Sequence, residues 1–400
     1  MLGLLFLFAC VGYALLDLRL LQGLGRLGTR DTRGGGTAGI ASSGNAADDA
    51  SREHPFVTVL IAARDEETNL PATLDALLAQ EWPRDRLQIV VADDRSTDGT
   101  AAVLQGYVAR HPGLVDAVTV TELPAGMSPK KHALARGLEI ARGEWIAVTD
   151  ADCKMGPQWL AALAVEFTDD AGMVLGLTAY DEPATGFKAA EGARALEFVS
   201  YGIVASGLIG LGFPVIGNAN NLAYRRRAFD EVGGFARHGA VVSGDDDFTL
   251  QEIHATGKWT VRYGTDPRAL MRTAPPEDWA RFWEQRKRWA GKTVHYRRAQ
   301  VLFLSLIFAF YVSIAALLLA GLFHLGDGSL GLLGLAGFAV KTAADYAVMK
   351  RGLEMYRLSP LLRFFPFTAA LHIPIMVGAF VAGSFGGFTW KGQKMRTKAA

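Results

Sequence analysis

Two acidic patterns have the residue types and the spacing to do chemistry. The first is the run Asp150-Ala151-Asp152. In an extended chain, residues i and i+2 face the same way, so both carboxylates can bind one hard divalent cation. Mg²⁺ and Mn²⁺ prefer a few carboxylates together with phosphate oxygens. A single pair of this kind is more often a solvated turn, so the assignment needs support from other residues.

The second pattern is a run of three consecutive carboxylates, Asp245-Asp246-Asp247, which follows Gly244. The three carboxylates cannot all be buried without a partner. Mutual repulsion and partial desolvation therefore raise the pKa of at least one of them. Such a carboxylate suits a general base that deprotonates an acceptor hydroxyl. A solvated or calcium-like acidic turn is the structural alternative.

Other polar groups could bind a charged ligand. The run that begins with Asp93 and Asp94 could place a buried carboxylate where it accepts hydrogen bonds from a nucleobase or ribose. Lys130 and Lys131 begin a predicted helix, where they oppose the helix dipole but could bind a diphosphate. A solvated helix face explains Lys131 equally well.

Near the predicted membrane boundary, a helix expected over Glu277–Arg297 carries Gln285, Arg288 and Trp289. Gln285 and Arg288 are three residues apart and share a helix face. Arg288 could bind diphosphate oxygens through two parallel hydrogen bonds, and Trp289 offers a flat apolar face to a sugar or a lipid. Anchoring at a membrane surface explains basic neighbours such as Lys287, but it does not require Gln285.

The elements that must position these residues are strands that alternate with helices from Phe56 onward. This alternation predicts a parallel sheet with helices on both faces. Ligands of such sheets bind at the carboxyl ends of the strands, and the acidic clusters fall there. The sequence has no P-loop, and no Gly-x-Gly-x-x-Gly follows the first strand. The predicted strands are Val57–Ala62, Leu87–Ala92, Ala117–Thr121 and Trp145–Thr149, and the predicted helices are Asn69–Gln80, Thr97–Arg110 and Lys130–Arg142.

Composition narrows the class of protein. The chain has 400 residues, of which 50% are apolar and 20% are charged, and its formal net charge is +1. It is too apolar for a disordered chain, and it lacks the basic excess of a nucleic-acid-binding protein. Its two cysteines, Cys10 and Cys153, exclude a disulfide framework and a zinc site.

The apolar residues concentrate in four segments that could enter a membrane. Lys341 and Asp345 lie four residues apart in the third segment, so they can pair on a helix. For the last segment a full crossing, a re-entrant segment and a hairpin bent at Pro374 all remain open. Residues 29–54, rich in Gly, Ala, Ser and Asp, predict a flexible tether. The four segments are Met1–Leu16, Val301–Phe323, Leu330–Met349 and Phe364–Phe388.

Basic residues indicate the orientation in the membrane. No Lys or Arg precedes the first segment, whereas four Arg follow it between residues 19 and 33. Six more basic residues lie between residues 286 and 298, before the second segment. The positive-inside rule places the intervening domain in the cytoplasm. The expected location of the protein is the plasma (inner) membrane. A full crossing by the last segment would leave the basic tail outside.

In their order along the chain, these motifs resemble those of a membrane-bound family 2 glycosyltransferase with a GT-A fold. The resemblance covers Phe56 to about Lys292. Each motif by itself is weak, and the shared order makes the resemblance specific. The motifs are Ala63-Arg64-Asp65-Glu66-Glu67, Asp93-Asp94-Arg95-Ser96-Thr97-Asp98-Gly99-Thr100, Lys130 with Ala133-Leu134, Asp150-Ala151-Asp152, Gly244-Asp245-Asp246-Asp247, and Gln285-x-x-Arg288-Trp289.

The resemblance implies inverting transfer of a hexosyl or N-acetylhexosaminyl group from a nucleotide diphosphate sugar, with a UDP-sugar favoured over a GDP-sugar. It implies Mg²⁺ or Mn²⁺ as cofactor, and it carries the following roles. The catalytic base is Asp245, with Asp246 as its rival; Asp150 and Asp152 hold the metal; the donor contacts are Glu66, Asp93, Asp94, Lys130, Asp150, Gln285, Arg288 and Trp289; the acceptor contacts are Asn218, Asn220, Asn221 and Trp289.

Two positions depart from the family pattern. Ser243-Gly244 replaces the more usual Thr-Glu or Gly-Glu, which leaves the register of the base between Asp245 and Asp246 open. Asp65 stands where the family often has Asn. Neither change removes a required charge.

The expected architecture is an α/β GT-A domain with a mainly parallel sheet, flanked by transmembrane helices. The expected divisions are an anchor over 1–22, a linker over 23–55, the GT-A domain with an interface helix over 56–298, a membrane region of two to three spans over 299–390, and a basic tail over 391–400.

Three functions fit this architecture. Extrusion of a polysaccharide needs enough helices to wall off a polar path, and three or four spans are few. A lipid or lipid-linked acceptor at the cytoplasmic face is therefore favoured over the alternative of a processive polysaccharide synthase. An inactive membrane scaffold should have lost some motif carboxylates, and none is missing. The expected partners are the sugar donor, the acceptor and the bilayer, without nucleic acid.

Overall fold

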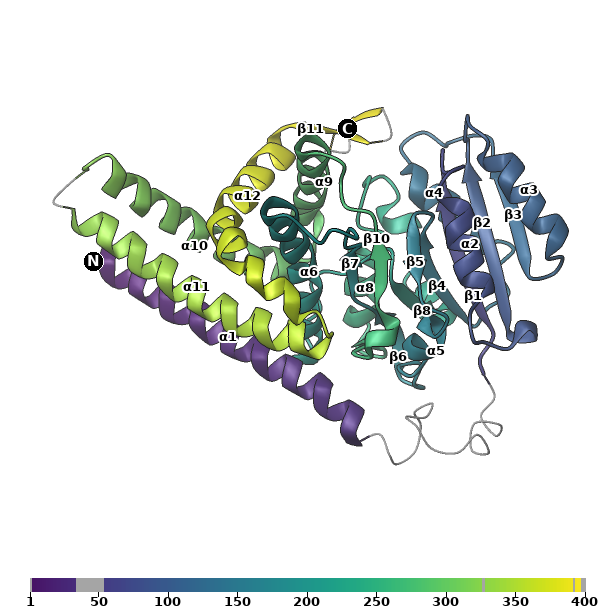
Figure 1. Cartoon of the computed structure of the whole chain (residues 1–400), viewed down its shortest axis with the longest axis horizontal. Helices are drawn as coiled ribbons and strands as arrows, with labels where there is room; N and C mark the ends of the chain where they lie inside the picture. Colours follow the sequence, from purple (N-terminus) through teal and green to yellow (C-terminus); the bar gives the residue numbers. More distant parts are fainter. Residues whose placement is uncertain (1, 34–53, 326–327, 391–392, 397–400) are drawn as a thin grey trace. The chain divides into compact units, whose positions relative to one another are not determined.

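A computed structural model describes residues 2–33, 54–325, 328–390 and 393–396. The chain divides into two compact units. The sheet unit contains residues 28–181 and 214–275, and the helical unit contains residues 1–27, 182–213 and 276–397. Figure 1 shows the elements of both units along the chain.

The sheet unit is built around a seven-stranded sheet with the order β3-β2-β1-β4-β8-β6-β9. β1, β2, β3 and β4 pair in parallel, and β8 runs antiparallel to β4 and β6, so the sheet is mixed but mainly parallel, as predicted. Its strands are β1 (Val57–Ala63), β2 (Leu87–Asp94), β3 (Val115–Val120), β4 (Trp145–Asp150), β6 (Ala171–Leu175), β8 (Leu222–Arg225) and β9 (Thr260–Tyr263).

The register of the parallel strands brings the acidic clusters to one edge. Ala63 of β1 pairs with Asp93 of β2, and Ala62 pairs with Asp150 of β4. These residues are the last or nearly the last of their strands. The loops that follow β1, β2 and β4 therefore leave the sheet side by side.

Helices cover both faces because alternate strand residues point to opposite sides. Val57, Val59 and Ile61 pack with residues of α2, α3 and α5 in one buried cluster. On the other face α4 lies so close that a Cβ at Gly137 would meet Leu60 Cδ1 at 2.4 Å. The helices of this unit are α2 (Leu70–Leu78), α3 (Thr100–Arg110), α4 (Pro129–Leu138), α5 (Trp159–Ala164), α7 (Arg226–Glu231) and α8 (Asp247–Ala255).

Short elements complete the sheet unit. A three-stranded sheet has the order β5-β10-β7, and short 3₁₀ turns connect larger elements. The strands are β5 (Cys153–Met155), β7 (Thr178–Tyr180) and β10 (Met271–Thr273), and the turns are η2 (Arg84–Arg86), η3 (Ala236–His238) and η4 (Pro267–Ala269).

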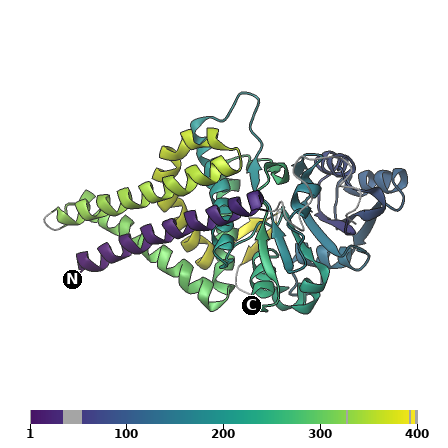
Figure 2. The ribbon, with the colours of Figure 1, turned by 90° about the horizontal axis from the view of Figure 1, so that it is seen from below.

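Among the residues that the structure describes, four helical segments are long and apolar enough to cross a membrane, at 3–29, 298–322, 329–355 and 359–384. α1, α10 and α11 extend together in one direction (Figures 1 and 2). The elements of the helical unit are α1 (Leu2–Arg33), α6 (Ala189–Gly210), α9 (Trp279–Gly291), η5 (Lys292–His295), α10 (Arg298–Leu322), α11 (Ser329–Met355), η6 (Ser359–Phe364), α12 (Phe365–Phe385), β11 (Gly387–Trp390) and β12 (Gln393–Arg396).

Several predicted boundaries shift. α1 continues to Arg33, past the predicted start of the linker, and the helix predicted to reach Arg297 ends at Gly291 and gives way to η5. Pro374 lies inside the single helix α12 rather than between two helices. Residues 34–53 of the predicted linker, and 391–392 and 397–400 of the predicted tail, lie outside the described residues.

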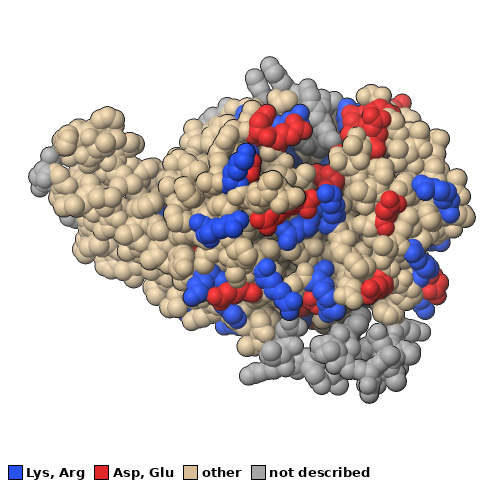
Figure 3. All heavy atoms as spheres, in the orientation of Figure 1, with Lys and Arg blue, Asp and Glu red and all other residues tan. Residues whose placement is uncertain are grey.

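The surface of the long helices suits lipid. On the face drawn in Figure 3, the ends of α10 and α11 show no Lys, Arg, Asp or Glu. Leu302 and Leu306 of α10 and Leu332 and Leu335 of α11 are all more than half exposed. Large exposed apolar side chains of this density are expected where a helix meets the hydrocarbon of a bilayer.

A polar cluster lies inside this apolar bundle. The predicted pair of Lys341 and Asp345 is confirmed, with 2.5 Å between Nζ and Oδ2. Lys341 is fully buried, and its Nζ also lies 2.9 Å from His372 Nδ1 of α12. Tyr13 of α1 donates its hydroxyl hydrogen to Asp345 at 2.8 Å and lies 2.9 Å from the hydroxyl of Tyr311 of α10. The cluster therefore joins all four apolar helices.

Candidate active site

Lys130 joins the two acidic patterns of the sheet unit. Its Nζ lies 2.6 Å from Asp150 Oδ1 at the end of β4 and 3.5 Å from Asp245 Oδ2 just before α8. Lys130 itself is in the first turn of α4. The fold thus brings together one carboxylate of the Asp-x-Asp run and one of the three-carboxylate run, which are 95 positions apart in the sequence.

The charge of Lys130 is stabilised by this surrounding. Burial alone would lower the pKa of its ammonium, but Asp150, Asp245 and Asp246 together raise the pKa above its ordinary value. The ammonium is therefore a permanent positive charge in the site. A group of this kind can balance carboxylates or bind the oxygens of a phosphate.

Asp152 shows how crowded the negative charges are. Its burial, followed by the nearby Asp150 and Glu66 carboxylates, raises its pKa to about 6. A positive charge beside Asp152 would relieve this repulsion. The site therefore has a position where an added cation would be stabilised.

The donor atoms suit a hard cation. Asp150 and Asp152 offer carboxylate oxygens, which are the ligands that Mg²⁺ and Mn²⁺ prefer. Within the described residues, no group of three or more His, Cys, Asp or Glu side chains could hold a metal ion by itself. The two aspartates therefore fit an ion that takes its remaining ligands from a bound molecule, such as a diphosphate.

The three consecutive carboxylates differ in their surroundings. Asp246 is buried and caps α8, because its Oδ1 accepts a hydrogen bond from Asp247 N at 2.8 Å. Asp247 is buried and accepts the N–H of Gly217 at 2.6 Å. Asp245 is half-buried and is the most accessible of the three. Gly244 precedes it with a φ of +80°, a backbone conformation that glycine adopts without strain.

The loops after β1 and β2 use several acidic residues to hold one another. Asp65 accepts a hydrogen bond from Thr97 N at 2.7 Å, and Glu67 accepts one from Gly99 N at 2.7 Å. In the other direction Asp98 accepts one from Glu67 N at 3.1 Å. Asp65 has a φ of 53°, in the left-handed region that Asp and Asn tolerate best among residues with a side chain. These carboxylates are therefore structural.

The predicted donor contacts of these loops have more varied positions. Glu66 is half-buried and accepts a hydrogen bond from Asn69 Nδ2 at 2.9 Å. Asp93 is buried at the end of β2 and accepts one from Ser96 N at 3.2 Å. Asp94 is also buried and is paired with Arg95 Nε at 2.8 Å. All three stand at the same edge of the sheet as Asp150.

The predicted acceptor contacts need a correction. Asn221 is fully buried, and its amide bonds to Trp159, Leu177 and Ala269 in the core. Asn220 is also buried and accepts a hydrogen bond from Thr178. Both amide atoms of Asn221 and the amide oxygen of Asn220 therefore bond within the fold, which gives these two residues a structural role. Asn218 is half-buried and remains available for that role.

Lys131 is a residue whose role the sequence did not reveal. It is buried rather than on a solvated helix face. Its ammonium donates three hydrogen bonds, to the carbonyl oxygens of His238, Val241 and Ser243 at 2.7, 2.9 and 3.1 Å. It thereby holds the loop that leads into Asp245. The sequence alone does not indicate that the partners of this lysine are backbone carbonyls.

The predicted Gln285, Arg288 and Trp289 lie on α9 in the helical unit. Trp289 packs against Phe198 of α6, with 6.0 Å between the ring centroids. Gln285 Oε1 accepts a hydrogen bond from Arg286 Nη1 at 2.5 Å. All three predicted residues are half-buried.

Arg286 was not predicted to be important. Its guanidinium is buried and forms an ion pair with the buried Glu197 of α6, with Nε to Oε1 at 2.8 Å. The guanidinium also stacks on Trp289 at 4.5 Å from the ring centre. Glu197 and Arg286 thus fix the orientation of α9 and of its Gln285 and Trp289 side chains. Arg286 did not stand out in the sequence because it is one of five consecutive polar or charged residues, 284–288.

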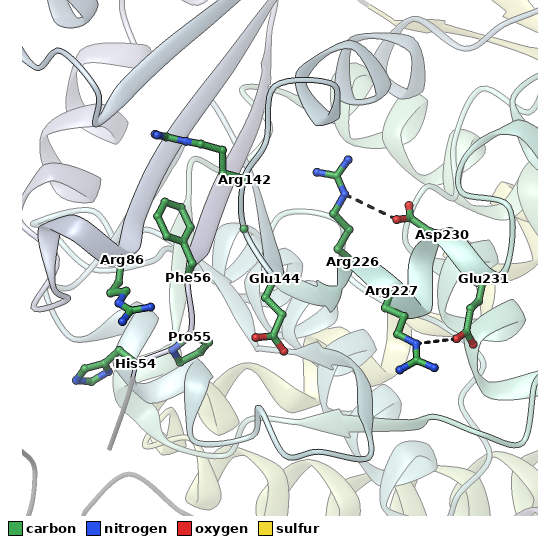
Figure 4. Close-up of a pocket in the computed structure, with 11 residues that line it drawn as sticks. His54, Pro55, Phe56, Arg86, Arg142, Glu144, Arg226, Arg227, Asp230 and Glu231 are labelled. Carbon is green, nitrogen blue, oxygen red and sulfur yellow. Dashed lines mark hydrogen bonds and ion pairs between the residues drawn. The ribbon is translucent and has the colours of Figure 1, made fainter. Parts of the chain in front are cut away.

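A cavity of about 830 Å³ lies at the opposite edge of the sheet, before β1 and β4. Figure 4 shows its basic and acidic side chains, including the ion pairs of Arg226 with Asp230 and of Arg227 with Glu231. Because it lies at the amino ends of the parallel strands, it is separate from the cluster around Lys130. Its charges largely balance one another.

Comparison with known families gives one match over most of the chain. A model of Glycosyl transferase family 21 matches residues 32–399.

Two curated relatives are similar over part of the chain. The probable glycosyltransferase YdaM of Bacillus subtilis is 28% identical over 250 residues, which are 60% of this chain and 55% of YdaM. The beta-monoglucosyldiacylglycerol synthase of Synechocystis is 28% identical over 249 residues, which are 59% of this chain and 47% of the synthase. The chain thus spans about half the length of these relatives.

One solved structure is similar over nearly its full length. It is the mannosyltransferase PcManGT from Pyrobaculum calidifontis in complex with GDP-Man and Mn²⁺. The TM-score is 0.56 at 21% identity, and the match covers 96% of this chain and 98% of the mannosyltransferase. This similarity supports the glycosyltransferase fold.

Proposed function

Since the chain belongs to glycosyl transferase family 21, we propose that it transfers a sugar from a nucleotide diphosphate sugar to a hydroxyl of a lipid or lipid-linked acceptor at the cytoplasmic face of the inner membrane. The observation that carries the proposal is the contact of Lys130 with both Asp150 and Asp245. A carboxylate suited to a metal diphosphate and one suited to a base then border the same small space, as a displacement at a sugar carbon requires.

In this mechanism Asp245 removes the proton from the acceptor hydroxyl. The acceptor oxygen forms a bond to the anomeric carbon while the bond from that carbon to the diphosphate oxygen breaks. The electron pair of the broken bond leaves with the nucleoside diphosphate. Attack from the face opposite to the diphosphate inverts the anomeric carbon, so an α-linked donor gives a β-linked product.

The diphosphate is bound by positive charge. Asp150 and Asp152 would hold Mg²⁺ or Mn²⁺, which supplies charge that neutralises the diphosphate. Lys130 keeps a positive charge in the same site. Arg288 is proposed to bind diphosphate oxygens, and Glu66, Asp93 and Asp94 to contact the nucleoside. Gln285 and Trp289 of α9 would contact the donor, and Trp289 and Asn218 the acceptor.

Two observations favour a lipid acceptor. A similar protein, the Synechocystis synthase, is named for a glycosylated diacylglycerol. The chain itself carries four apolar helical segments of membrane-spanning length. The transferred group is proposed to be a hexosyl or N-acetylhexosaminyl group, with UDP as the favoured nucleotide.

Product analysis tests the proposal. Purified full-length protein in lipid nanodiscs is incubated with Mn²⁺, labelled UDP- or GDP-sugars and diacylglycerol-containing lipid, and the lipids are analysed by mass spectrometry. We expect one defined glycolipid from one donor. A ladder of chain lengths would instead indicate a processive synthase. No product, together with no calorimetric binding of any donor, would indicate a scaffold.

A further inference from the structure

The path of α12 decides how often the chain crosses the membrane. α10 and α11 form a hairpin, and at their connection a Cβ on Gly321 would lie 2.5 Å from Gly331 Cα. The end of the bundle with this connection is called the far end. The near end is where α9 and η5 lead into α10 and where α11 ends.

The first residues of α12 lie at the near end. α12 follows α11 after the short η6 turn. Thr368 Oγ1 donates a hydrogen bond to the carbonyl of Ala193 in α6 at 3.1 Å. α6 also contacts the last part of α11, because a Cβ on Gly352 would meet Ile203 at 2.4 Å. The ring of Phe365 at the start of α12 packs against Tyr346 of α11, with 5.2 Å between the ring centroids, so α12 begins beside the last three turns of α11.

The last residues of α12 lie at the near end as well. A Cβ on Gly383 would lie 2.3 Å from the carbonyl oxygen of Lys287 in α9, so the two backbones touch. Beyond α12, Thr389 N donates a hydrogen bond to Glu284 Oε2 of α9 at 2.6 Å. α9 leads directly into the start of α10. A helix that crossed the bundle would instead end beside the α10–α11 connection.

The middle of α12 lies deep in the bundle. Ile373 packs with Phe310 and Ile314 of α10, and His372 lies 2.9 Å from Lys341. His372 lies seven residues after Phe365, which is roughly 10 Å along the helix at 1.5 Å of rise per residue. Pro374 follows at this depth, and a proline bends a helix because it lacks an N–H and crowds the preceding turn.

The distribution of basic residues agrees with this path. No Lys or Arg occurs in residues 1–18 or 299–340, which include the far end. Four precede α12 between residues 350 and 363, and four follow it between residues 391 and 398. A crossing helix normally has the basic excess at one end only.

We propose that α12 is a re-entrant helix, which enters the bilayer from the side at which α9 leads into α10, bends at Pro374 and returns to that side. The chain then crosses the membrane three times, by α1, α10 and α11. β11 and β12, which follow α12, then lie on the same side of the membrane as α9. The exposed Phe367, Leu371 and Val381 of α12 face the lipid of that leaflet.

Cysteine labelling tests this topology in the full-length chain. The native Cys10 and Cys153 are buried, so the parent protein gives the background. Three single substitutions are compared: Glu139→Cys on the sheet unit, Ser329→Cys at the far end and Ala400→Cys at the C-terminus. Sealed right-side-out vesicles are treated with a membrane-impermeant maleimide, before and after permeabilisation with detergent.

We expect Ser329→Cys to be labelled in sealed vesicles, and Glu139→Cys and Ala400→Cys only after permeabilisation. Labelling of Ala400→Cys in sealed vesicles, together with Ser329→Cys, would overturn the proposal and establish a fourth crossing. The readout does not depend on enzymatic activity, so it stands or fails separately from the proposed sugar transfer.

Discussion

Adjacent residues can have unrelated tasks in one site. Lys130 contacts the side chains of Asp150 and Asp245, whereas Lys131 contacts three backbone carbonyls of the loop before Asp245. Both are lysines at the start of α4, and only their direction differs. One therefore sets the charge of the site, and the other sets the position of a loop.

The first prediction at this scale concerns Asp245. Asp245→Asn removes the proposed base but keeps the size of the side chain, so we expect turnover to fall by roughly 10²–10⁴-fold. Binding of the donor, measured by calorimetry, should remain within a few-fold of wild type. Transfer rates near those of the unchanged enzyme would show that Asp245 is not the base, and Asp246→Asn would then be the variant to measure.

The second prediction concerns Asp152 and pH. Burial and its carboxylate neighbours raise its pKa to about 6 in the metal-free protein, so Asp152 is protonated below that pH. A divalent ion requires the carboxylate form, and its binding must then release a proton. The affinity for Mn²⁺ should therefore fall by about tenfold for each pH unit below 6 and level off above about 7.

Calorimetric titrations of Mn²⁺ at a fixed donor concentration, between pH 5 and 8, measure this dependence. Asp152→Asn is the matched control, because it cannot titrate. This variant should bind Mn²⁺ more weakly, and its affinity should show no step near pH 6. The same step in both proteins would assign the pH dependence to a different group.

At the scale of elements, the site depends on loops that hold each other in place. Residues just before and at the start of α4 donate several hydrogen bonds to η3 and the loop that follows it. Ser128 N donates to the carbonyl of Gly239 at 2.7 Å, in addition to the three bonds from Lys131. The position of Asp245 relative to Lys130 is thus fixed by contacts between two elements rather than within either one.

The third prediction follows from the hydrogen bonds of Lys131. Lys131→Met keeps the length of the side chain but leaves three buried carbonyls without their donor, a loss of about 1–3 kcal/mol for each unsatisfied group. We expect a lower kcat with nearly unchanged donor affinity, since the donor contacts are elsewhere. Amide hydrogens of residues 238–245 should exchange faster.

Two further variants separate positioning from a general loss of stability. Lys131→Arg retains a cation with several donors and should restore part of kcat. Arg136→Met removes an exposed basic residue of the same helix and should leave both kcat and exchange unchanged. Unchanged exchange of residues 238–245 in Lys131→Met would contradict the assigned role.

At the scale of the whole molecule, the two units are held together internally by different means. The sheet unit has an extended apolar core on one face of its sheet and a small cluster of Ala92, Val120 and Ala133 elsewhere. The helical unit combines an apolar cluster with the buried polar group around Lys341. In an apolar bundle such a group fixes the register of helices, because any shift would leave charges unpaired.

The fourth prediction tests this difference. Lys341→Met leaves Asp345 buried without its ammonium, which should destabilise the helical unit by about 3–5 kcal/mol. Lys341→Met combined with Asp345→Leu removes both charges and should recover most of the loss. Thermal unfolding in detergent measures the effect. Donor binding at low temperature should be equal in all three proteins, and a loss of stability no smaller in the double variant would refute the pairing argument.

Local sequence patterns predicted the protein class and the fold. Alternating strands and helices, apolar segments of membrane length and the motif order predicted a glycosyltransferase with a GT-A fold, and both the class and the fold are confirmed. The matching family is family 21, so the narrower assignment to family 2 is not confirmed. These features are encoded in spacing and hydropathy, which are properties of neighbouring residues along the chain.

Tertiary contacts decided what each polar residue does. Asp65, Glu67 and Asp98 belong to the acidic motifs of the sequence and accept hydrogen bonds from backbone N–H groups, and Asn221, which the resemblance implied as an acceptor contact, bonds within the core. Lys131 is buried because three carbonyls from more than a hundred residues away reach it. A side chain's partner depends on which distant segment the fold places beside it, so composition and spacing could name the residue types of the site but could not divide them between chemistry and structure.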